Sequence, residues 1–423
     1  MINAIKNNRN LLKSILSILS VDTLVKASNL LLLPIYLKLM LPEEYGMFAY
    51  VIGFSTLISS IGSMGMYGVL NRYFYDNSFM KNEVISTLLI LLIGSIVITI
   101  LISLASSSLW INYLFSSNPS YLILALAIFS ALHSVLIQFI MGFFYIKKDY
   151  KEIQIFNISR LVLVNSISLC VLYFFNSDAT VERLVGLIFS ELIVVIFFLK
   201  YLLKYFSFNN FNKRLALLSL KFGYPLTLSA ILGFIYAFAD KYFIQSNFGF
   251  SSVGEYVFIF MFASLFGMIF SAIQNFWLPF FFNPKNKEIR EKRLLQLFSG
   301  LFLINVIYYI GIVILLKILF YFNVFDSIYE NGMRYLWLLV FAQFFSSVQS
   351  LYNNYYSLYD KTLYGLYVSL ISAITSLIVM YLLVSTYQVY GVSIAVLINS
   401  IVGLILTIFF VNRLKKKYAE QYI

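Results

Sequence analysis

Long, nearly uncharged apolar runs alternate with short polar gaps along the whole 423-residue chain. A helix needs about 20 apolar residues to cross a hydrocarbon core of roughly 30 Å. Strands of a membrane barrel would instead be segments of about 10 residues with alternating hydrophobicity, and the runs here are too long and too uniform for that. The sequence therefore predicts an all-α polytopic membrane protein with about twelve transmembrane helices. The runs lie at approximately 11–36, 45–66, 84–106, 120–145, 153–175, 183–201, 222–246, 254–282, 294–320, 335–357, 363–385 and 390–411.

The composition indicates the same class of protein. Hydrophobic residues make up 61% of the chain and charged residues only 11%, so a water-exposed surface could not be covered. The net charge of +12 does not indicate nucleic-acid binding, because that needs a basic face on a soluble domain. We expect it to attract anionic membrane lipids instead. The single cysteine, Cys170, lies inside an apolar run, which excludes a disulfide framework and a cysteine metal cluster.

The basic residues predict the orientation in the membrane. Cytoplasmic loops of membrane proteins are enriched in Lys and Arg. If the N-terminus is cytoplasmic, twenty-three of the 30 basic residues fall in cytoplasmic gaps or tails, and the outer gaps carry only Lys38, Arg183 and Arg334. Both termini are then cytoplasmic. The first run carries Asp22 and Lys26 and is too long for a signal peptide, so we expect a retained first helix.

The two halves of the chain share a pattern. The segment Leu41–Gly46 opens the second run, and Val253–Tyr256 opens the eighth, at the same place in a second set of six. Repeats with an even number of spans keep the same orientation, which puts a substrate site between the two lobes. The predicted organisation is an N-lobe of helices 1–6 (1–201), a cytoplasmic interfacial linker (202–221), a C-lobe of helices 7–12 (222–412) and a basic cytoplasmic tail (413–423).

No catalytic machinery is evident. The gaps between runs are short, and Walker, GxSxG and HExxH patterns are lacking from the sequence. We therefore expect a transporter without a cofactor or metal. Membrane glycan polymerases are also polytopic, but a large external loop usually carries their chemistry, and the outer gaps here are small.

Several segments resemble the bacterial polysaccharide-exporter family, closest in size to its Wzx type, the O-antigen and capsule-unit flippases. They are Leu41–Gly46, Asn71–Phe74, Tyr224–Leu226, Ala239–Lys241 and Val253–Tyr256. The resemblance implies a MATE-like fold of two six-helix lobes in the bacterial cytoplasmic (inner) membrane. It further implies alternating-access transfer of undecaprenyl-pyrophosphate-linked oligosaccharide, for O-antigen or capsule, to the periplasmic leaflet. A polymerase and a chain-length regulator of a lipopolysaccharide-type pathway are the implied partners.

Charged groups inside spans are costly and usually face a cavity or one another. Asp22, Lys26 and Asn29 share one face of the first helix, with Asp22 near mid-bilayer. Lys26 and Asn29 are candidate substrate contacts and Asp22 a candidate ion-coupling residue. The alternative is an ion pair between Asp22 and Lys26 that only packs against a neighbouring helix.

A second candidate group lies on the fifth helix. Arg160 shares a face with Asn157, roughly 10 Å from the cytoplasmic boundary. The planar guanidinium can bind phosphate through two parallel hydrogen bonds. Both residues are candidate substrate contacts, and the alternative for Arg160 is that its side chain extends to the inner lipid headgroups. Arg72, at the end of the second helix, is a further candidate whose alternative role is a positive-inside anchor.

Ion coupling could involve three groups besides Asp22. Glu191 lies mid-span on the sixth helix, where it could carry a proton or pair with Lys26 or Arg160. Asp240 lies near the outer end of the seventh helix, and we expect no ion pair with Lys241 because adjacent helical residues point in different directions. His133 is the only histidine, and it is either a proton relay or an ordinary hydrogen-bonded group between helices.

Two other functions remain open. A drug or cation antiporter would share the fold but rely on an acidic, aromatic pocket. A membrane glycan polymerase is the second alternative. The glycines Gly62, Gly65 and Gly68 are expected to permit close helix approach, and aromatic residues near span ends, Trp277 among them, are expected in the headgroup belt.

Overall fold

The computed structural model describes residues 28, 30–115, 120–175, 177–282, 286–359, 361 and 363–418. The predicted site residues Asp22, Lys26 and Asn29 lie outside these ranges. Within them the regular structure is helical throughout, which confirms the all-α prediction. A helix at Leu30–Leu39 precedes the labelled elements. These are α2 (Pro42–Ser63), α3 (Met66–Tyr73), α4 (Lys81–Ala105), α5 (Ser107–Leu114), α6 (Tyr121–Lys147), α7 (Tyr150–Phe175), α8 (Ala179–Leu203), η1 (Phe208–Asn210), α9 (Lys213–Ser264), α10 (Phe266–Phe282), α11 (Arg290–Tyr321), η3 (Ser327–Gly332), α12 (Met333–Leu358) and α13 (Leu363–Tyr418).

The helices fit the lengths required for membrane spans. Among the described residues, eight helical stretches are long and apolar enough to cross a membrane. The two longest helices are not regular throughout: α9 contains Gly249 (φ 80°) and α13 contains Gln388 (φ 54°), both with non-helical backbone. The predicted runs 222–246 and 254–282 lie on either side of Gly249. Those at 363–385 and 390–411 likewise flank Gln388, and both lie within α13. The run 254–282, in contrast, is divided between the end of α9 and α10.

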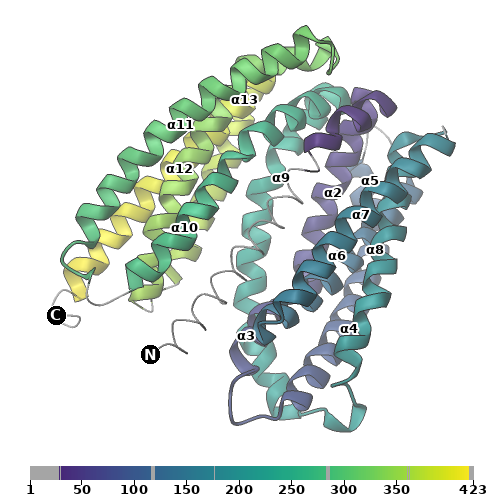
Figure 1. Cartoon of the computed structure of the whole chain (residues 1–423), viewed down its shortest axis with the longest axis vertical. Helices are drawn as coiled ribbons and strands as arrows, with labels where there is room; N and C mark the ends of the chain where they lie inside the picture. Colours follow the sequence, from purple (N-terminus) through teal and green to yellow (C-terminus); the bar gives the residue numbers. More distant parts are fainter. Residues whose placement is uncertain are drawn as a thin grey trace. The chain divides into compact units, whose positions relative to one another are not determined.

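The chain divides into two compact units, 1–234 and 235–423. In the first unit, α6 is the central helix: it packs against α2 and α8, while α7 packs mainly against α8 (Figure 1). Of the most apolar part of α6, 61% is buried, against 17% for α7. The helix α7, which carries Arg160, therefore lies at the periphery of this unit and presents most of its side chains outward.

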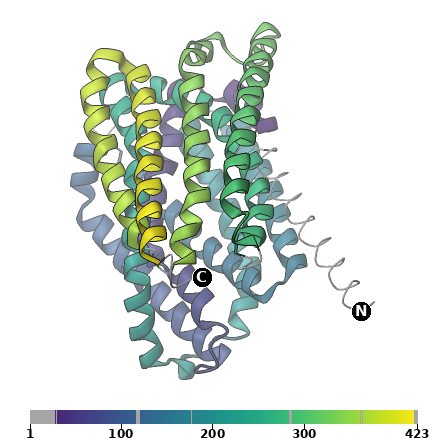
Figure 2. The ribbon, with the colours of Figure 1, turned by 90° about the vertical axis from the view of Figure 1, so that its left-hand side faces the viewer.

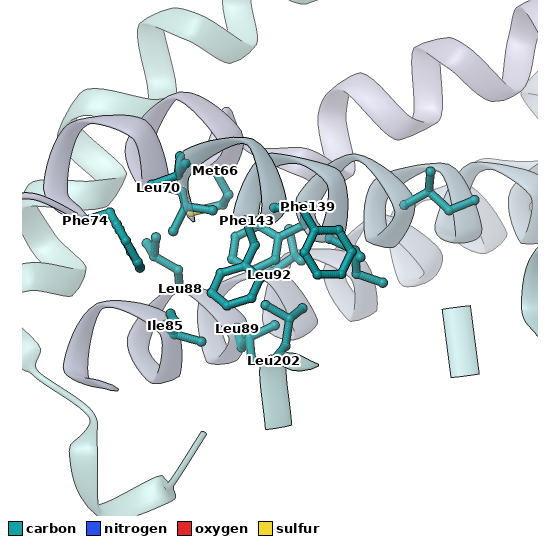
Figure 3. Packing of buried hydrophobic residues seen from close by; sticks show 14 of the residues in the cluster. Met66, Leu70, Phe74, Ile85, Leu88, Leu89, Leu92, Phe139, Phe143 and Leu202 are labelled. Atoms are coloured by element: carbon teal, nitrogen blue, oxygen red, sulfur yellow. The ribbon is translucent and has the colours of Figure 1, made fainter. Parts of the chain in front are cut away.

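One end of the first unit is held by a dense apolar cluster (Figure 3). Phe139 and Phe143 of α6 project toward Leu88 and Leu92 of α4, with Met66 of α3 beside them. Without water in the bilayer core, such clusters stabilise a helix bundle mainly through close van der Waals contact. The cluster thereby fixes α4, α6 and α8 with respect to one another.

The second predicted span ends earlier than expected because the backbone turns. Met64 (φ 43°) and Gly65 (φ 64°) adopt the left-handed conformation and separate α2 from α3. A Cβ atom on Gly65 would lie 2.8 Å from the carbonyl oxygen of Gly223 in α9, closer than real Cβ contacts allow. The expectation of close helix approach is therefore confirmed at Gly65, which is needed for both its conformation and its lack of a side chain.

The segment between α8 and α9 is hydrogen-bonded to α4. The backbone N–H of Ser207 donates to the hydroxyl oxygen of Ser86 at 3.0 Å. The backbone N–H of Asn212 donates to the hydroxyl oxygen of Thr87, also at 3.0 Å. Ser86 and Thr87 are fully buried. These bonds satisfy backbone donors that a loop leaves unpaired.

In the second unit, α12 is the central helix. It packs along α13 and also contacts α10 and α11. The green to yellow helices α11, α12 and α13 stand side by side in Figure 2. Aromatic side chains dominate the core. Phe281 of α10 meets Tyr355 of α12 edge to face at 4.9 Å, and Phe344 is buried in the same cluster.

Candidate functional site

The clearest polar contact inside the spans joins α7 to α8. The Nε of Arg160 donates to Oε1 of Glu191 at 3.0 Å, and a second guanidinium nitrogen donates to the same oxygen. The exposure of the two side chains differs sharply: 42% for Arg160 and 4% for Glu191. The buried carboxylate is thus compensated by its partner, while the Arg160 side chain remains partly exposed. Of the two pairings that the sequence left open for Glu191, the structure shows this one.

The pair is possible because α7 and α8 approach closely. A Cβ atom on Gly186 would lie 2.7 Å from the Cα of Ser168, so only glycine fits at this crossing. The two helices run antiparallel, which brings Arg160 opposite Glu191 on one side of the crossing. The hydroxyl of Ser168 is buried without a hydrogen-bond partner among the described residues.

Polar groups continue along the same pair of helices. The hydroxyl of Tyr36, from the helix Leu30–Leu39, donates to Oδ1 of Asn165 at 3.1 Å, and Nδ2 of Asn165 donates to the carbonyl of Leu161 at 2.8 Å. Asn157, the predicted substrate contact, lies nearly one helical turn before Arg160 and is partly buried.

Arg183, counted in the sequence among outer-loop residues, lies inside α8 and is surrounded by aromatic rings. Its guanidinium carbon is 4.0 Å from the ring centre of Tyr36, 3.9 Å from that of Phe48 and 5.6 Å from that of Tyr45. No carboxylate of the described residues is within ion-pairing distance of it. Such a cage stabilises a cation through the negative faces of the rings.

Hydrogen bonds between α8 and α2 position this cage. Asp178 caps α8 by accepting from the amide of Val181 at 3.1 Å. The hydroxyl of Thr180 then donates to the backbone carbonyl of Glu44 at 3.1 Å, and the amide of Ala179 donates to the side-chain carboxylate of Glu44 at 3.3 Å. The first turn of α8 is thereby fixed against the first turn of α2, which carries Phe48. The sequence does not show this arrangement, because six helices, α2 to α7, lie between Tyr36 and Arg183 along the chain.

We call the set Arg160, Glu191, Asn165, Tyr36 and Arg183 the polar column. Arg183 and Glu191 are eight residues apart on α8, so their backbone positions lie about 12 Å apart along the helix axis. The column contains two guanidinium groups and one carboxylate, so it carries a formal excess of positive charge.

A second polar cluster lies in the second unit. The Nζ of Lys241 donates to Oδ1 of Asp240 at 3.2 Å, and the hydroxyl of Tyr256 donates to Oδ2 of Asp240 at 2.8 Å. The prediction that Asp240 and Lys241 form no ion pair is therefore wrong. The long lysine side chain can fold back along the helix, which adjacent short side chains cannot do. Asp240 is buried, with both carboxylate oxygens in hydrogen bonds.

The remaining candidates have local partners. The Nδ1 of the buried His133 donates to the carbonyl of Phe129, one turn earlier in α6, at 2.8 Å. Arg72 is exposed at the end of α3, with its guanidinium carbon 4.6 Å from the ring centre of Phe222. In the adjacent loop, hydrogen bonds from the backbone and side chain of Ser78 hold the pKa of Asp76 below its ordinary value.

The fold matches known membrane proteins over nearly its full length. A structure of the lipid II flippase MurJ in an inward closed conformation has a TM-score of 0.71 at 15% identity, covering 94% of this chain and 87% of that one. An inward-facing multidrug resistance MATE family transporter of the MOP superfamily has a TM-score of 0.64 at 15% identity, covering 94% and 96%. A MATE structure in complex with MaD5 has a TM-score of 0.57 at 18% identity, with 94% of each chain covered. The protein therefore has the MATE-like fold that the sequence predicts.

The family follows from the sequence match. Residues 11–284 match the model of the family described as "Polysaccharide biosynthesis protein". The chain belongs to this family, which agrees with the resemblance drawn from its motifs. None of the curated proteins compared with the chain matches it.

Proposed function

We propose that this protein is a flippase of the bacterial cytoplasmic membrane. It moves undecaprenyl-pyrophosphate-linked oligosaccharide units, of O-antigen or capsule type, from the cytoplasmic to the periplasmic leaflet. Transport proceeds by alternating access of two lobes, with the boundaries 1–201 and 222–412, the linker 202–221 and the tail 413–423. Family membership and the MATE-like fold support a transporter of this kind.

The observation that carries the proposal is the partly exposed side chain of Arg160 beside the buried Glu191. An arginine facing hydrocarbon would be strongly unfavourable, so its open side is expected to face an aqueous path. Glu191 holds one edge of the planar group, which fixes its orientation before a ligand arrives. The other edge can donate two parallel hydrogen bonds to a phosphate. Arg160 would then bind the pyrophosphate, with Asn157 and Asn165 available to sugar hydroxyls.

The other predicted contacts extend this proposal. Lys26 and Asn29 would bind the same head group from the first helix, and Arg72 would attract it at the cytoplasmic entrance. Energy coupling would involve Asp22, Glu191, Asp240 or His133. In this scheme a polymerase and a chain-length regulator of the same pathway act on the units after they reach the outer leaflet.

The test uses a strain that lacks this protein and carries it on a plasmid. Arg160→Ala should abolish surface glycan and leave lipid-linked units on the cytoplasmic face. Lys317→Ala is the matched control, because Lys317 is also an exposed basic residue within a span but lies outside the polar column. Normal glycan export by Arg160→Ala at wild-type protein level would refute the role of Arg160.

Two alternatives give different results in the same strain. A drug or cation antiporter would show lost cation efflux with intact glycan. This alternative is disfavoured by the pairing of Glu191 and Asp240 with basic residues, which leaves neither as an open acidic site. A glycan polymerase would instead leave single repeat units accumulated on the periplasmic face.

A further inference from the structure

A groove lies between α10 and α11 in the second unit, and none of its lining residues belongs to the polar column. Its volume is about 550 Å³, which is within the roughly 300–1,000 Å³ typical of ligand sites. Ile273, Trp277 and Phe280 line it from α10, and Arg293, Gln296 and Leu297 line it from α11. Four apolar side chains thus form the wall, and the polar side chains come only from α11.

The polar residues of the groove have unused donors. The guanidinium of Arg293 donates one hydrogen bond, from Nη1 to Oε1 of Gln296 at 3.0 Å. No carboxylate in the described part of the chain pairs with Arg293, because Glu291 is instead bonded to Lys415 at 2.6 Å. Most of the five N–H groups of this arginine therefore remain available to an anion.

Trp277 is the largest of the apolar side chains that line the groove. It is only 4% exposed, and its indole Nε1 is buried with no hydrogen-bond partner among the described residues. Trp277 also corrects the expectation of a headgroup-belt residue, because its ring packs in the protein core beside Phe281 at 5.6 Å.

The surrounding charge defines the class of ligand. Lys287 lies between α10 and α11, and Arg290 and Lys292 lie with Arg293 in the first turn of α11. The positive-inside pattern assigns this region to the cytoplasmic leaflet. Basic residues at this level attract anionic lipids by about 1 kcal/mol each. An apolar wall with a basic, hydrogen-bonding mouth matches a molecule with one phosphodiester and an acyl chain.

We propose that this groove binds an anionic glycerophospholipid of the inner leaflet. The phosphodiester accepts hydrogen bonds from Arg293 and the amide of Gln296, and one acyl chain lies along Ile273, Trp277 and Phe280. The lipid spans α10 and α11, so its binding stabilises their packing in one arrangement. This site is separate from the transport site and does not depend on the proposed function.

The chain offers a direct reporter of occupancy. It contains three tryptophans, so replacement of Trp110 and Trp337 by Phe leaves Trp277 as the only one. The single-tryptophan protein is reconstituted into phosphatidylcholine vesicles that contain phosphatidylglycerol with brominated acyl chains. Bromine quenches nearby indoles, so selective quenching relative to brominated phosphatidylcholine measures preference for the anionic lipid at this groove.

We expect at least a several-fold preference for phosphatidylglycerol, reduced to near equality in Arg293→Gln. Arg214→Gln, which removes an exposed basic residue at the start of α9 in the other unit, should keep the preference. Arg293→Lys should retain part of it, because charge remains but the planar fork is lost. The emission maximum of Trp277 and the helical circular dichroism verify folding of each variant.

Four outcomes would overturn the proposal. Equal quenching by both lipids in the parent protein would mean that the groove does not select anionic lipid. A preference that survives in Arg293→Gln would assign selectivity to other residues. Displacement of brominated phosphatidylglycerol by stoichiometric undecaprenyl phosphate would show that the groove binds the polyprenyl carrier instead, and displacement by millimolar inorganic phosphate would show a soluble-anion site.

Discussion

The guanidinium of Arg160 binds Oε1 of Glu191 across the α7–α8 contact, with an Nε to Oε1 distance of 3.0 Å. The carboxylate is almost completely buried and the guanidinium is not. Glu191 is therefore the buried member of the pair, and Arg160 is the member that remains accessible. Variants can separate these two roles.

Arg160→Gln leaves the buried Glu191 carboxylate without its partner, which should destabilise the protein by about 1–3 kcal/mol. The double variant Arg160→Gln with Glu191→Gln should restore most of the lost thermal stability, because a neutral amide pair replaces the broken ion pair. Transport should remain absent in the double variant. Thermal unfolding in detergent measures the stability of both variants, and surface glycan export measures transport. Restored export would mean that Arg160 only neutralises Glu191.

Gly186→Ala should destabilise the α7–α8 contact. The new Cβ atom would approach the Cα of Ser168 to 2.7 Å, so the helices would have to separate. Overpacking of this kind costs about 1–3 kcal/mol. Gly94→Ala is the control, because nothing lies within 4 Å of its Cβ position. We expect Gly94→Ala to leave the melting temperature unchanged or slightly raised, and an equal fall in both variants would contradict the prediction.

Arg183→Gln should lower stability by removing the cation from its aromatic cage. Each cation–π contact contributes about 0.5–2 kcal/mol, depending on desolvation. Phe48→Leu, which removes one ring at similar size, should produce a smaller loss. If the cage is the main stabilising feature, Phe48→Leu should add little further destabilisation in the background of Arg183→Gln. Strictly additive melting-temperature shifts would show that the ring and the cation act independently.

Asp240→Asn tests the proposed role in ion coupling. The amide can still accept the hydrogen bond from Tyr256, but it cannot gain or lose a proton. In proteoliposomes, the variant should transport lipid-linked oligosaccharide without the acceleration that a proton gradient gives to the wild type. Tyr256→Phe is the control, because it removes the 2.8 Å hydrogen bond without removing the titratable group. An unchanged gradient dependence in Asp240→Asn would exclude Asp240 from coupling.

The helical fold was predictable because lipid imposes a simple rule of length and apolarity on each span. The runs on either side of Gly249 and Gln388 were located although α9 continues past Gly249 and α13 continues past Gln388. Contacts between distant residues were harder. Arg160 and Glu191 could be listed as possible partners because both are charged groups inside spans, and such groups seek each other.

Other features of the site depend on backbone geometry or side-chain paths that the sequence does not display. Arg183 was assigned to an outer gap, because nothing in the sequence connects it with Tyr36 or Phe48. The pair of Asp240 and Lys241 was rejected from average helix geometry, whereas the flexible lysine reaches back to its neighbour. Trp277 was assigned to the membrane surface from its position near a span end, but packing against Phe281 places it in the core.

The pairing of Arg160 with Glu191 has an electrical consequence. The two charges cancel, so this part of the empty protein has no net charge to move when the lobes exchange access. Under the proposed function, the loaded protein would carry the negative charges of the pyrophosphate outward. In a cell whose interior is negative, that movement is favoured by about 2.3 kcal/mol per charge for each 100 mV. The resting potential would then add to the driving force for the loaded step, whereas the return step would move no net charge at this pair.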